Sequence, residues 1–359
     1  MRLRAVPYEV PFRRPIQTAH GTLLSRKGFW VLASEGQGFR GLGEVAPLPE
    51  WGTETLAEAE HALASLSSID LPTDPEGLGQ RLASLGLHRD RLPATLAGIE
   101  LACLDLLARE QAVSLASFLT PSGVPLERVP ANALLVSREP EELAAEARMR
   151  VQQGFGTLKV KVGVGAIAGD VARIRAVRDA VGPLIRLRAD ANGAWDLSTA
   201  DAALRALQPF DLQYLEQPVM DAEALATLHE RAYLPLAADE SAQDPRVVER
   251  LLEQRAVDWL IFKPMALGGL RYAARLVQKA REAGIGVTLT SVLDRGVGTA
   301  GALHLAATLG LDSACGLSNT HMDVPYFVGP VPEGGGLMIQ SPGHGLALDR
   351  AIAVPEETP

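Results

Sequence analysis

The sequence predicts an α/β protein: a modified (β/α) barrel of the TIM type with an α+β capping domain at its amino-terminal side. From about residue 128, eight short apolar or β-branched runs alternate with longer amphipathic helical patterns, at intervals of roughly 20–30 residues. Alternating strands and helices predict a parallel sheet. Eight such units in about 200 residues fit a closed barrel better than an open sheet. The first 125 residues lack this alternation and have a mixed α+β pattern.

In this amino-terminal part, residues 2–10 and 29–35 are predicted strands, joined by a connection rich in Arg and Gly. Residues 54–66 have helical apolar spacing, and Thr53 before them is the expected N-cap. Residues 93–112 are apolar on most faces, which predicts a buried helix.

The domain organisation follows from these patterns. We expect residues 1–125 to form the capping domain and residues 126–324 to form the barrel. The tail, 325–359, is rich in Gly and Pro and is expected to pack back on the capping domain and complete it. The predicted barrel strands, of which the last has the weakest pattern, are 130–136, 157–162, 185–190, 212–216, 235–239, 258–262, 286–290 and 314–317.

Composition limits the function classes. The chain has 359 residues, 47% of them hydrophobic and 21% charged, as in a globular protein with a real core. Its net charge of −9 argues against non-specific nucleic-acid binding, although small anionic substrates stay open. No window approaches the ~18 apolar residues of a membrane span, and no secretory signal is visible. We therefore expect a cytoplasmic protein that binds neither nucleic acid nor membrane, with a homo-oligomer left open.

Charged residues stand at or near the carboxyl ends of five successive predicted strands. Barrel strands are buried and should be apolar, so these positions call for an explanation. Active sites of this fold are built at that end of the barrel. In chain order the residues are Lys159 and Lys161, Arg188 with Asp190 and Asn192, Glu216, Asp239 with Glu240, and Lys263.

Three of the acids come from three successive strands and can converge on one point: Asp190, Glu216 and Asp239. Hard oxygen ligands of this kind suit Mg²⁺, with Mn²⁺ as the alternative metal. A single acid at a strand end is more often a helix cap or a solvated loop residue. Capping alone explains five consecutive charged strand ends poorly, which favours a catalytic site.

Other chemistries have weaker support. Residues 163–168 and 296–301 match a glycine pattern of dinucleotide sites, but such a match alone is weak. The second is better explained as a helix N-terminus at Gly296, open to a substrate carboxylate. Cys103 and Cys315 lie in apolar stretches without a His nearby in sequence, so buried structural roles are expected. His20 and His321 fall in loops and could line a pocket, although solvated or structural roles are favoured.

Taken together, these motifs resemble the enolase superfamily over nearly the whole chain. The matching residues are KVK at 159–161, DAN at 190–192, EQP at 216–218, ADES at 238–241 and FKP at 262–264. The K-x-K motif paired with a Lys on strand six resembles the muconate-lactonizing subgroup. A mandelate-racemase-like protein would have a His at the end of strand seven, where this chain has Ser291.

The resemblance implies roles for these residues. Asp190, Glu216 and Asp239 would bind Mg²⁺, and Lys161 and Lys263 would face each other across the α-carbon of a small carboxylate substrate. The pKa of a lysine base must fall toward neutrality, and burial, the adjacent lysine and the metal are expected to lower it. The expected substrate contacts are Lys159, Arg188, Asn192, Ser291 and Gly296.

Within the subgroup, residues 41–60 are similar to the segment G-E-x-x-P-L-P of o-succinylbenzoate synthases. That family dehydrates a cyclohexadiene carboxylate (SHCHC) through an enediolate intermediate in menaquinone biosynthesis. Asp294 stands where many relatives have Glu, so the contacts to the distal end of the substrate are open. A racemase of N-succinylamino acids, a dipeptide epimerase or a muconate cycloisomerase on the same site is the alternative. A catalytically silent barrel would predict loss of these acids and lysines, and none is lost.

Overall fold

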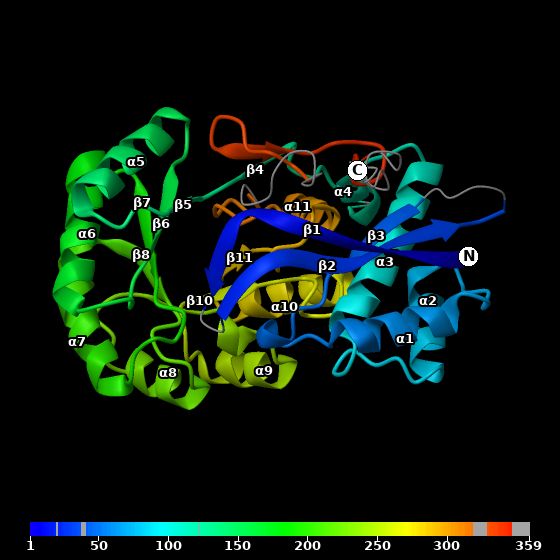
Figure 1. Cartoon of the computed structure of the whole chain (residues 1–359), viewed down its shortest axis with the longest axis horizontal. Coiled ribbons are helices and arrows are strands. Elements are labelled where there is room, and N and C mark those ends of the chain that lie inside the picture. The colour runs from blue at the N-terminus through cyan, green and yellow to red at the C-terminus, as the bar shows by residue number, and fades with distance from the viewer. Residues whose placement is uncertain (19–20, 37–40, 121, 319–328, 347–359) are drawn as a thin grey trace.

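The computed structural model describes residues 1–18, 21–36, 41–120, 122–318 and 329–346. A curled parallel sheet of seven strands forms its centre, with helices around the outside and a mostly β cap lying against it (Figure 1). The strands are β5 Ala133–Leu135, β6 Thr157–Lys161, β7 Arg186–Asp190, β8 Leu212–Glu216, β9 Leu236–Ala238, β10 Trp259–Phe262 and β11 Gly286–Leu289. Neighbours in the sheet are neighbours in the chain. This confirms the predicted fold class.

Helices connect these strands, and Asp side chains cap several of them. They are α5 Pro140–Gln152, α6 Ile167–Val181, α7 Leu197–Leu207, α8 Ala222–His229, α9 Pro245–Gln254, α10 Leu270–Glu282 and α11 Val297–Thr308, with the short turns η2 Gln208–Phe210 and η3 Glu240–Ala242. The carboxylates of Asp196, Asp221 and Asp244 accept from backbone N–H groups in the first turns of α7, α8 and α9. The strands β7, β8 and β9 thus each lead into a helix that begins at the same end of the sheet, where the strands finish.

The predicted eighth strand, 314–317, is present only as two single-residue bridges. Cys315 pairs in parallel with Ala131, ahead of β5, and Gly316 pairs with Thr290, after β11. These bridges join the two edges of the sheet. A Cβ atom at position 316 would lie 2.8 Å from the Thr290 methyl group, so the close approach requires glycine here.

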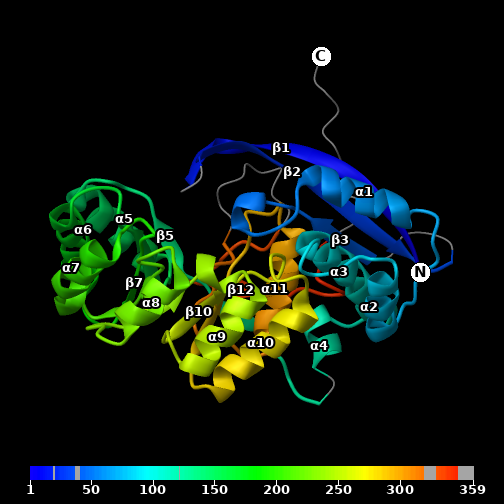
Figure 2. The ribbon, with the colours of Figure 1, turned by 90° about the horizontal axis from the view of Figure 1, so that it is seen from below.

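The cap contains a three-stranded antiparallel sheet: β1 Arg2–Thr18, β2 Gly21–Ser34 and β3 Gly41–Val45. The predicted strands 2–10 and 29–35 are the outer parts of one long hairpin, which crosses above the barrel (Figure 2). Pro7, Pro11 and Pro15 lie in β1, which is an edge strand. An edge strand tolerates Pro because it does not need every N–H for pairing, whereas a central strand does.

The helices of the cap are α1 Leu56–Leu66, α2 Pro75–Ser84, α3 Pro93–Glu110 and α4 Leu115–Leu119, preceded by the short turn η1 Pro49–Trp51. The N-cap of α1 is Thr55, which forms a capping box with Glu58, so the predicted cap at Thr53 was wrong. The Thr53 hydroxyl instead accepts from the Leu48 N–H. The helix α2 was not predicted.

The described part of the tail contacts both regions. The strand β12, Gly336–Met338, pairs with β4, Arg128–Pro130, beside the start of the barrel. Further on, the His344 N–H donates to the Asp105 carboxylate of α3, at 2.8 Å. His344 thus contacts the cap at Asp105, while the predicted domain organisation stays a prediction.

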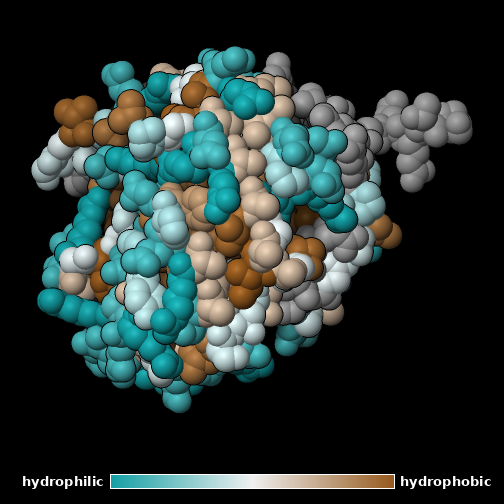
Figure 3. Space-filling view, turned by 90° about the vertical axis from the view of Figure 1, so that its left-hand side faces the viewer, coloured by the Kyte–Doolittle hydropathy of each residue, from teal (hydrophilic) through white to brown (hydrophobic). Residues whose placement is uncertain are grey.

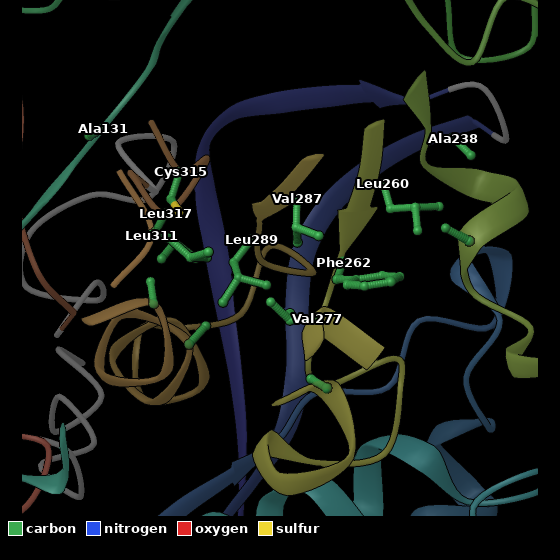
Figure 4. Packing of buried hydrophobic residues seen from close by; sticks show 14 of the residues in the cluster. Ala131, Ala238, Leu260, Phe262, Val277, Val287, Leu289, Leu311, Cys315 and Leu317 are labelled. Carbon is green, nitrogen blue, oxygen red and sulfur yellow. The ribbon is translucent and has the colours of Figure 1, made fainter. Parts of the chain in front are cut away.

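Two main apolar clusters form the core, and the larger one contains residues of both the barrel and the cap, among them Trp30 and Leu104. Side chains of β10 and β11 point toward the surrounding helices (Figure 4), and Val277 of α10 lies beside Phe262. A second cluster lies between the cap sheet and its helices, and Met265, Ala266 and Val292 of the barrel join it. Among the described helices, none combines the length and apolar character that crossing a bilayer requires. On the side of α5–α7, hydrophilic residues cover most of the surface, with an apolar band between them (Figure 3).

We expect Gly43→Ala to destabilise the cap. A Cβ atom at position 43 would lie 2.0 Å from the Gly98 carbonyl oxygen of α3, so the helix must move away from the sheet. Overpacking of this kind lowers the free energy of unfolding by about 1–3 kcal/mol. Gly79→Ala is the matched control, because a Cβ there on α2 meets nothing within 4 Å, and it should stabilise by about 0.5–1 kcal/mol. Denaturant unfolding of both variants measures the difference, and equal effects would contradict the close approach.

Candidate active site

The charged strand-end residues come together at one end of the barrel. The strands β6 to β10 are consecutive neighbours in the sheet, and Lys161, Asp190 and Glu216 are cross-strand partners at the same level. Asp239 and Lys263 follow directly after β9 and β10. Parallel strands all end at the same edge, so equal positions along five strands place these side chains around one point.

Lys159 lies between two of the predicted metal ligands. Its Nζ atom is 2.7 and 2.8 Å from the two carboxylate oxygens of Glu216 and 2.9 Å from Asp190 Oδ2. Burial by itself would lower the pKa of Lys159, but Asp190 and Glu216 raise it well above its usual range. Lys159 is therefore a fixed cation. Its predicted contact with a substrate carboxylate stays a prediction.

The two predicted catalytic lysines have different surroundings. Lys161 Nζ donates to Asp190 Oδ2 at 2.6 Å and to Asn192 Oδ1, and 42% of its side chain is exposed. Lys263 forms an ion pair with Asp239, and only 5% of its side chain is exposed. The Trp51 ring of the cap lies 4.9 Å from Lys263 Nζ, a cation–π arrangement. Lys161 is thus open to a ligand in the barrel mouth, whereas Lys263 is covered.

The three acids and the three lysines around them balance in formal charge, but their surroundings shift the pKa values of individual acids in opposite directions. Burial, followed by the neighbouring Asp190 and Asp239, raises the pKa of Glu216 to about 8. Burial also disfavours ionised Asp190, yet Lys159 and Lys161 hold its pKa well below the usual range. The two acids differ because, among the described residues, Asp190 has two ammonium partners, whereas Glu216 has one, Lys159.

The chemistry of these donors fits a hard divalent cation, because they are buried carboxylates from adjoining strand ends. Over the part of the chain that the structure describes, however, no three acidic, His or Cys side chains converge as a ready ligand set. The ammonium groups of Lys159 and Lys263 lie against the acids instead. To bind a metal, the carboxylate oxygens must turn away from these lysines.

Gln217 is a positioning residue that the sequence analysis missed. Its side-chain oxygen accepts from the N–H groups of Asp239 and Ser241, at 2.9 and 3.2 Å. Its amide nitrogen donates to the Val219 carbonyl at 2.8 Å. Gln217 thereby fixes the backbone after β8 to the backbone after β9, and so the two acids Glu216 and Asp239. The EQP motif contains this residue, but the motif alone does not indicate which groups form hydrogen bonds with it.

Arg188 lies deeper in the barrel than the acids, one inward-facing position before Asp190. It is fully buried, and its guanidinium donates to Gln213, Asn132, Ser313 and the Ala314 carbonyl, at 2.8 to 3.2 Å. All four partners are groups of the protein itself and not of a ligand. In this arrangement Arg188 therefore links separate segments of the barrel. Ser291 follows β11 and is half-buried at the mouth. For both residues a contact with substrate stays a prediction.

The predicted open helix N-terminus at Gly296 is filled by carboxylates of this chain. Glu44 of β3 accepts from the N–H groups of Arg295, Val297 and Gly298, at 2.6 to 3.1 Å. The Gly296 N–H itself donates to Asp294, at 3.0 Å. The expectation of a free anion site here is therefore wrong in this structure, because a carboxylate of the cap occupies the helix N-terminus instead.

Asp294, whose role the sequence left open, caps the helix α11. Its Oδ1 atom accepts from the Thr299 N–H at 2.9 Å and the Thr299 hydroxyl at 2.6 Å. Arg26 of the cap reinforces the same junction. It is buried and donates to the carbonyls of Pro47 and Leu293, at 2.7 and 3.2 Å, which ties a cap loop to the loop after β11. Sequence reasoning missed both Arg26 and Glu44, whose partners in the segment after β11 lie more than 250 residues away.

We expect the contribution of Glu44 to stability to depend on pH. Burial and the nearby Asp294 raise its pKa to about 7, although hydrogen bonds from Tyr8 and from backbone N–H groups lower it. A carboxyl group whose folded pKa is raised contributes its full stability below its unfolded pKa of about 4.3 and loses it as the pH rises through the folded value. Glu44→Gln should therefore lower the free energy of unfolding more at pH 5 than at pH 8.

Guanidinium unfolding at the two pH values measures this difference. Glu50→Gln is the control, because Glu50 is exposed on η1, and it should change little at either pH. A loss of stability in Glu44→Gln that is equal at pH 5 and pH 8 would contradict the raised pKa.

His20 and His321, named as pocket candidates, lie outside the described residues. All of the predicted acids and lysines lie within them. The structure thus brings together Lys159, Lys161, Asp190, Asn192, Glu216, Asp239 and Lys263.

Comparisons with known proteins agree with this architecture. A family model described as "Enolase C-terminal domain-like" matches residues 142–352, and one described as "MenC, N-terminal domain" matches residues 2–72. An o-succinylbenzoate synthase from Thermobifida fusca is 42% identical over 207 residues, or 55% of this chain. The aligned part spans 62% of that relative's length, which is less than two thirds.

Two further similarities cover nearly the whole chain. A hydrophobic dipeptide epimerase from Enterococcus faecalis is 29% identical over 336 residues, which are 93% of this chain and 92% of that protein. A crystal structure of a dipeptide epimerase from Enterococcus faecalis V583, complexed with Mg and the dipeptide L-Leu-L-Tyr, has a TM-score of 0.85 and 28% identity. It covers 96% of this chain and 99% of that one. By these matches the chain belongs to the enolase superfamily, and among named relatives it resembles o-succinylbenzoate synthases.

Proposed function

We propose that this enzyme is a Mg²⁺-dependent dehydratase that converts SHCHC to o-succinylbenzoate, a step of menaquinone biosynthesis in the cytoplasm. The similarity of residues 2–72 to the MenC amino-terminal domain supports this substrate, as does the similarity to the Thermobifida fusca synthase. The amino-terminal region matters because its loops lie at the barrel mouth, where Trp51 contacts Lys263.

The observation that carries the reaction type is the difference between the two lysines. A racemase needs a base on each face of the α-carbon, whereas a dehydration on one face needs only one. Lys161 is 42% exposed at the mouth, and Lys263 is 5% exposed, held by Asp239 and covered by Trp51. This arrangement favours Lys161 as the single base and Lys263 as a fixed positive charge.

In the proposed reaction, neutral Lys161 takes the proton from the α-carbon, and negative charge develops on the substrate carboxylate. Lys161 then returns the proton to the departing hydroxyl on the same face, so that water leaves and the ring becomes aromatic. Lys263 stabilises the developing charge from the other side. Asp190, Glu216 and Asp239 would hold Mg²⁺ or Mn²⁺. A bound metal would supply positive charge where the substrate carboxylate becomes more negative.

The alternative is a racemase, epimerase or cycloisomerase acting at the same site. Relatives that cover nearly the whole chain include dipeptide epimerases and an N-succinyl Arg/Lys racemase, which supports this alternative. Both lysines would then act as bases, and Lys263 would have to become accessible from beneath Trp51.

Ultraviolet absorbance tests the proposal directly. Purified protein loaded with Mg²⁺ is mixed with SHCHC, and aromatic product is expected only when both the metal and Lys161 are present. EDTA and Lys161→Ala are the controls. If SHCHC is not turned over while Mg²⁺ still raises the melting temperature, the dehydratase proposal fails and N-succinylamino acids are the next substrates to test.

A further inference from the structure

The structure contains a fourth acid at the mouth, the half-buried Glu240, which none of the roles above uses. Burial, followed by the charges of Asp239 and Asp190, raises the pKa of its carboxyl group. Its Oε1 atom accepts from the Asn192 side-chain amide, at 2.9 Å. Its Oε2 atom is buried and, within the described chain, has no hydrogen-bond partner. The contact with Asn192 is therefore what ties this carboxylate to the site.

Asn192 connects Glu240 to the proposed base. The amide nitrogen of Asn192 donates to Glu240, and its amide oxygen accepts from Lys161 Nζ. The opposite orientation would place an NH₂ group against the lysine ammonium and a carbonyl oxygen against the carboxylate, and both contacts are repulsive. The charges at the two ends thus select one orientation of the amide.

The backbone at Asn192 makes this position unusual. Its φ of 46° lies in the left-handed region, which Asn tolerates better than most residues. Its N–H also donates to Asp190 Oδ1, at 3.0 Å. The tight turn after β7 thereby points the Asn192 side chain between two strand ends, toward both β6 and the turn after β9.

We propose that Glu240 is a positioning residue that fixes Lys161 through Asn192. The proposal deepens the proposed function, on which it rests for the role of Lys161 as base. If Asp190 serves as a metal ligand, Asn192 is the acceptor that is still available to hold the Lys161 amine. A base held at one place reaches the substrate in a productive geometry more often, so the loss of Glu240 should lower kcat more than it raises KM.

The decisive experiment needs no substrate. Trace acylation by acetic anhydride, read by peptide mass spectrometry, reports how readily each lysine amine reacts, and Lys279 in the same sample is the internal reference. In Glu240→Leu, Lys161 loses its oriented acceptor and should be acylated about two- to tenfold faster, the ratio that corresponds to one hydrogen bond. Glu240→Gln keeps an acceptor oxygen and should be close to wild type. Glu253→Gln, on the exposed face of α9, is the matched control and should change nothing.

A double substitution tests whether Glu240 acts through Asn192. If it does, Glu240→Leu combined with Asn192→Ala should accelerate the acylation of Lys161 no further than Asn192→Ala alone. Additive effects, or an unchanged rate in Glu240→Leu, would overturn the proposal. If Glu240→Leu does not fold, the comparison is made with Glu240→Ala. These outcomes are independent of the substrate, so a failure to turn over SHCHC contradicts only the proposed function.

Discussion

Lys161→Met is expected to abolish turnover while leaving the fold intact. The substitution keeps the length of the side chain but removes the amine that takes the α-proton. Loss of a general base lowers kcat by about 10²–10⁴-fold, with little change in KM when the group does not contribute to binding. Asp190, the main partner of Lys161, still has Lys159 at 2.9 Å, so no buried carboxylate is left without a cation. The melting temperature should therefore stay close to that of the wild type.

Lys279→Met is the matched control, because Lys279 is half-exposed on α10 and pairs with Glu249 away from the mouth. Steady-state kinetics and thermal melting of the two variants give the comparison. The expectation holds for elimination and for racemisation alike, because both begin with proton removal at the α-carbon. Full activity in Lys161→Met would refute the mechanism.

Lys263→Met then separates the two reaction types. In a one-base elimination it removes a positive charge. Turnover then falls, and the α-proton is still exchanged on the same face of the α-carbon as in the wild type. In a two-base racemase it stops the reaction from one enantiomer only. Solvent deuterium incorporation into each enantiomer of an N-succinylamino acid distinguishes these outcomes. Loss confined to one enantiomer would support the racemase and contradict the single-base mechanism.

Much of the site could be predicted because its residues follow local rules. The positions of Lys161, Asp190 and Glu216 depend only on where short strands end, and parallel strands that follow one another in the chain end at the same edge. The strand bounds that matter most were therefore nearly correct: 212–216 agrees with β8, and 157–162 exceeds β6 by one residue.

What could not be predicted depends on contacts between distant parts of the chain. Glu44 reaches the helix N-terminus at Val297 across 253 residues, and no local pattern indicates that a cap carboxylate fills that site. The long hairpin was cut short because its middle part, rich in Arg and Gly, was predicted to be a connection, whereas the structure extends both strands through it. The role of Asn192 depends in the same way on Glu240, from another strand end.

Arg188 combines the two cases: its position on the strand was predictable from the local pattern, but its partners were not. Sequence spacing correctly places it on the same strand face as Asp190, and the family resemblance implied a contact with substrate. Depth within the barrel decides its partners, and spacing says nothing about depth. In the structure it is fully buried, and its guanidinium is 4.9 Å from the Tyr214 ring. Its hydrogen bonds to Ser313 and Ala314 reach the segment that closes the barrel.

We therefore expect Arg188→Met to lower the free energy of unfolding by about 3–5 kcal/mol, because it leaves several buried oxygen acceptors without a donor. Removing the buried cation also relieves a desolvation penalty. This gain is smaller than the loss, because the acceptors on Asn132, Gln213 and Ala314 stay in place and keep their own desolvation cost. Arg186→Met is the matched control: it lies on the same strand, is exposed, and should change stability by less than about 0.5 kcal/mol.

Denaturant unfolding of both variants, with hydrogen exchange at the amides of Cys315 and Gly316, measures this effect. Those two N–H groups form the bonds that close the barrel, to Pro130 and Leu289 at 2.8 and 2.9 Å. Faster exchange there in Arg188→Met, but not in Arg186→Met, is expected because Arg188 holds the neighbouring residues Ser313 and Ala314. If Arg188→Met instead unfolds like the wild type and only its KM rises, then Arg188 contacts the substrate and does not hold the barrel together.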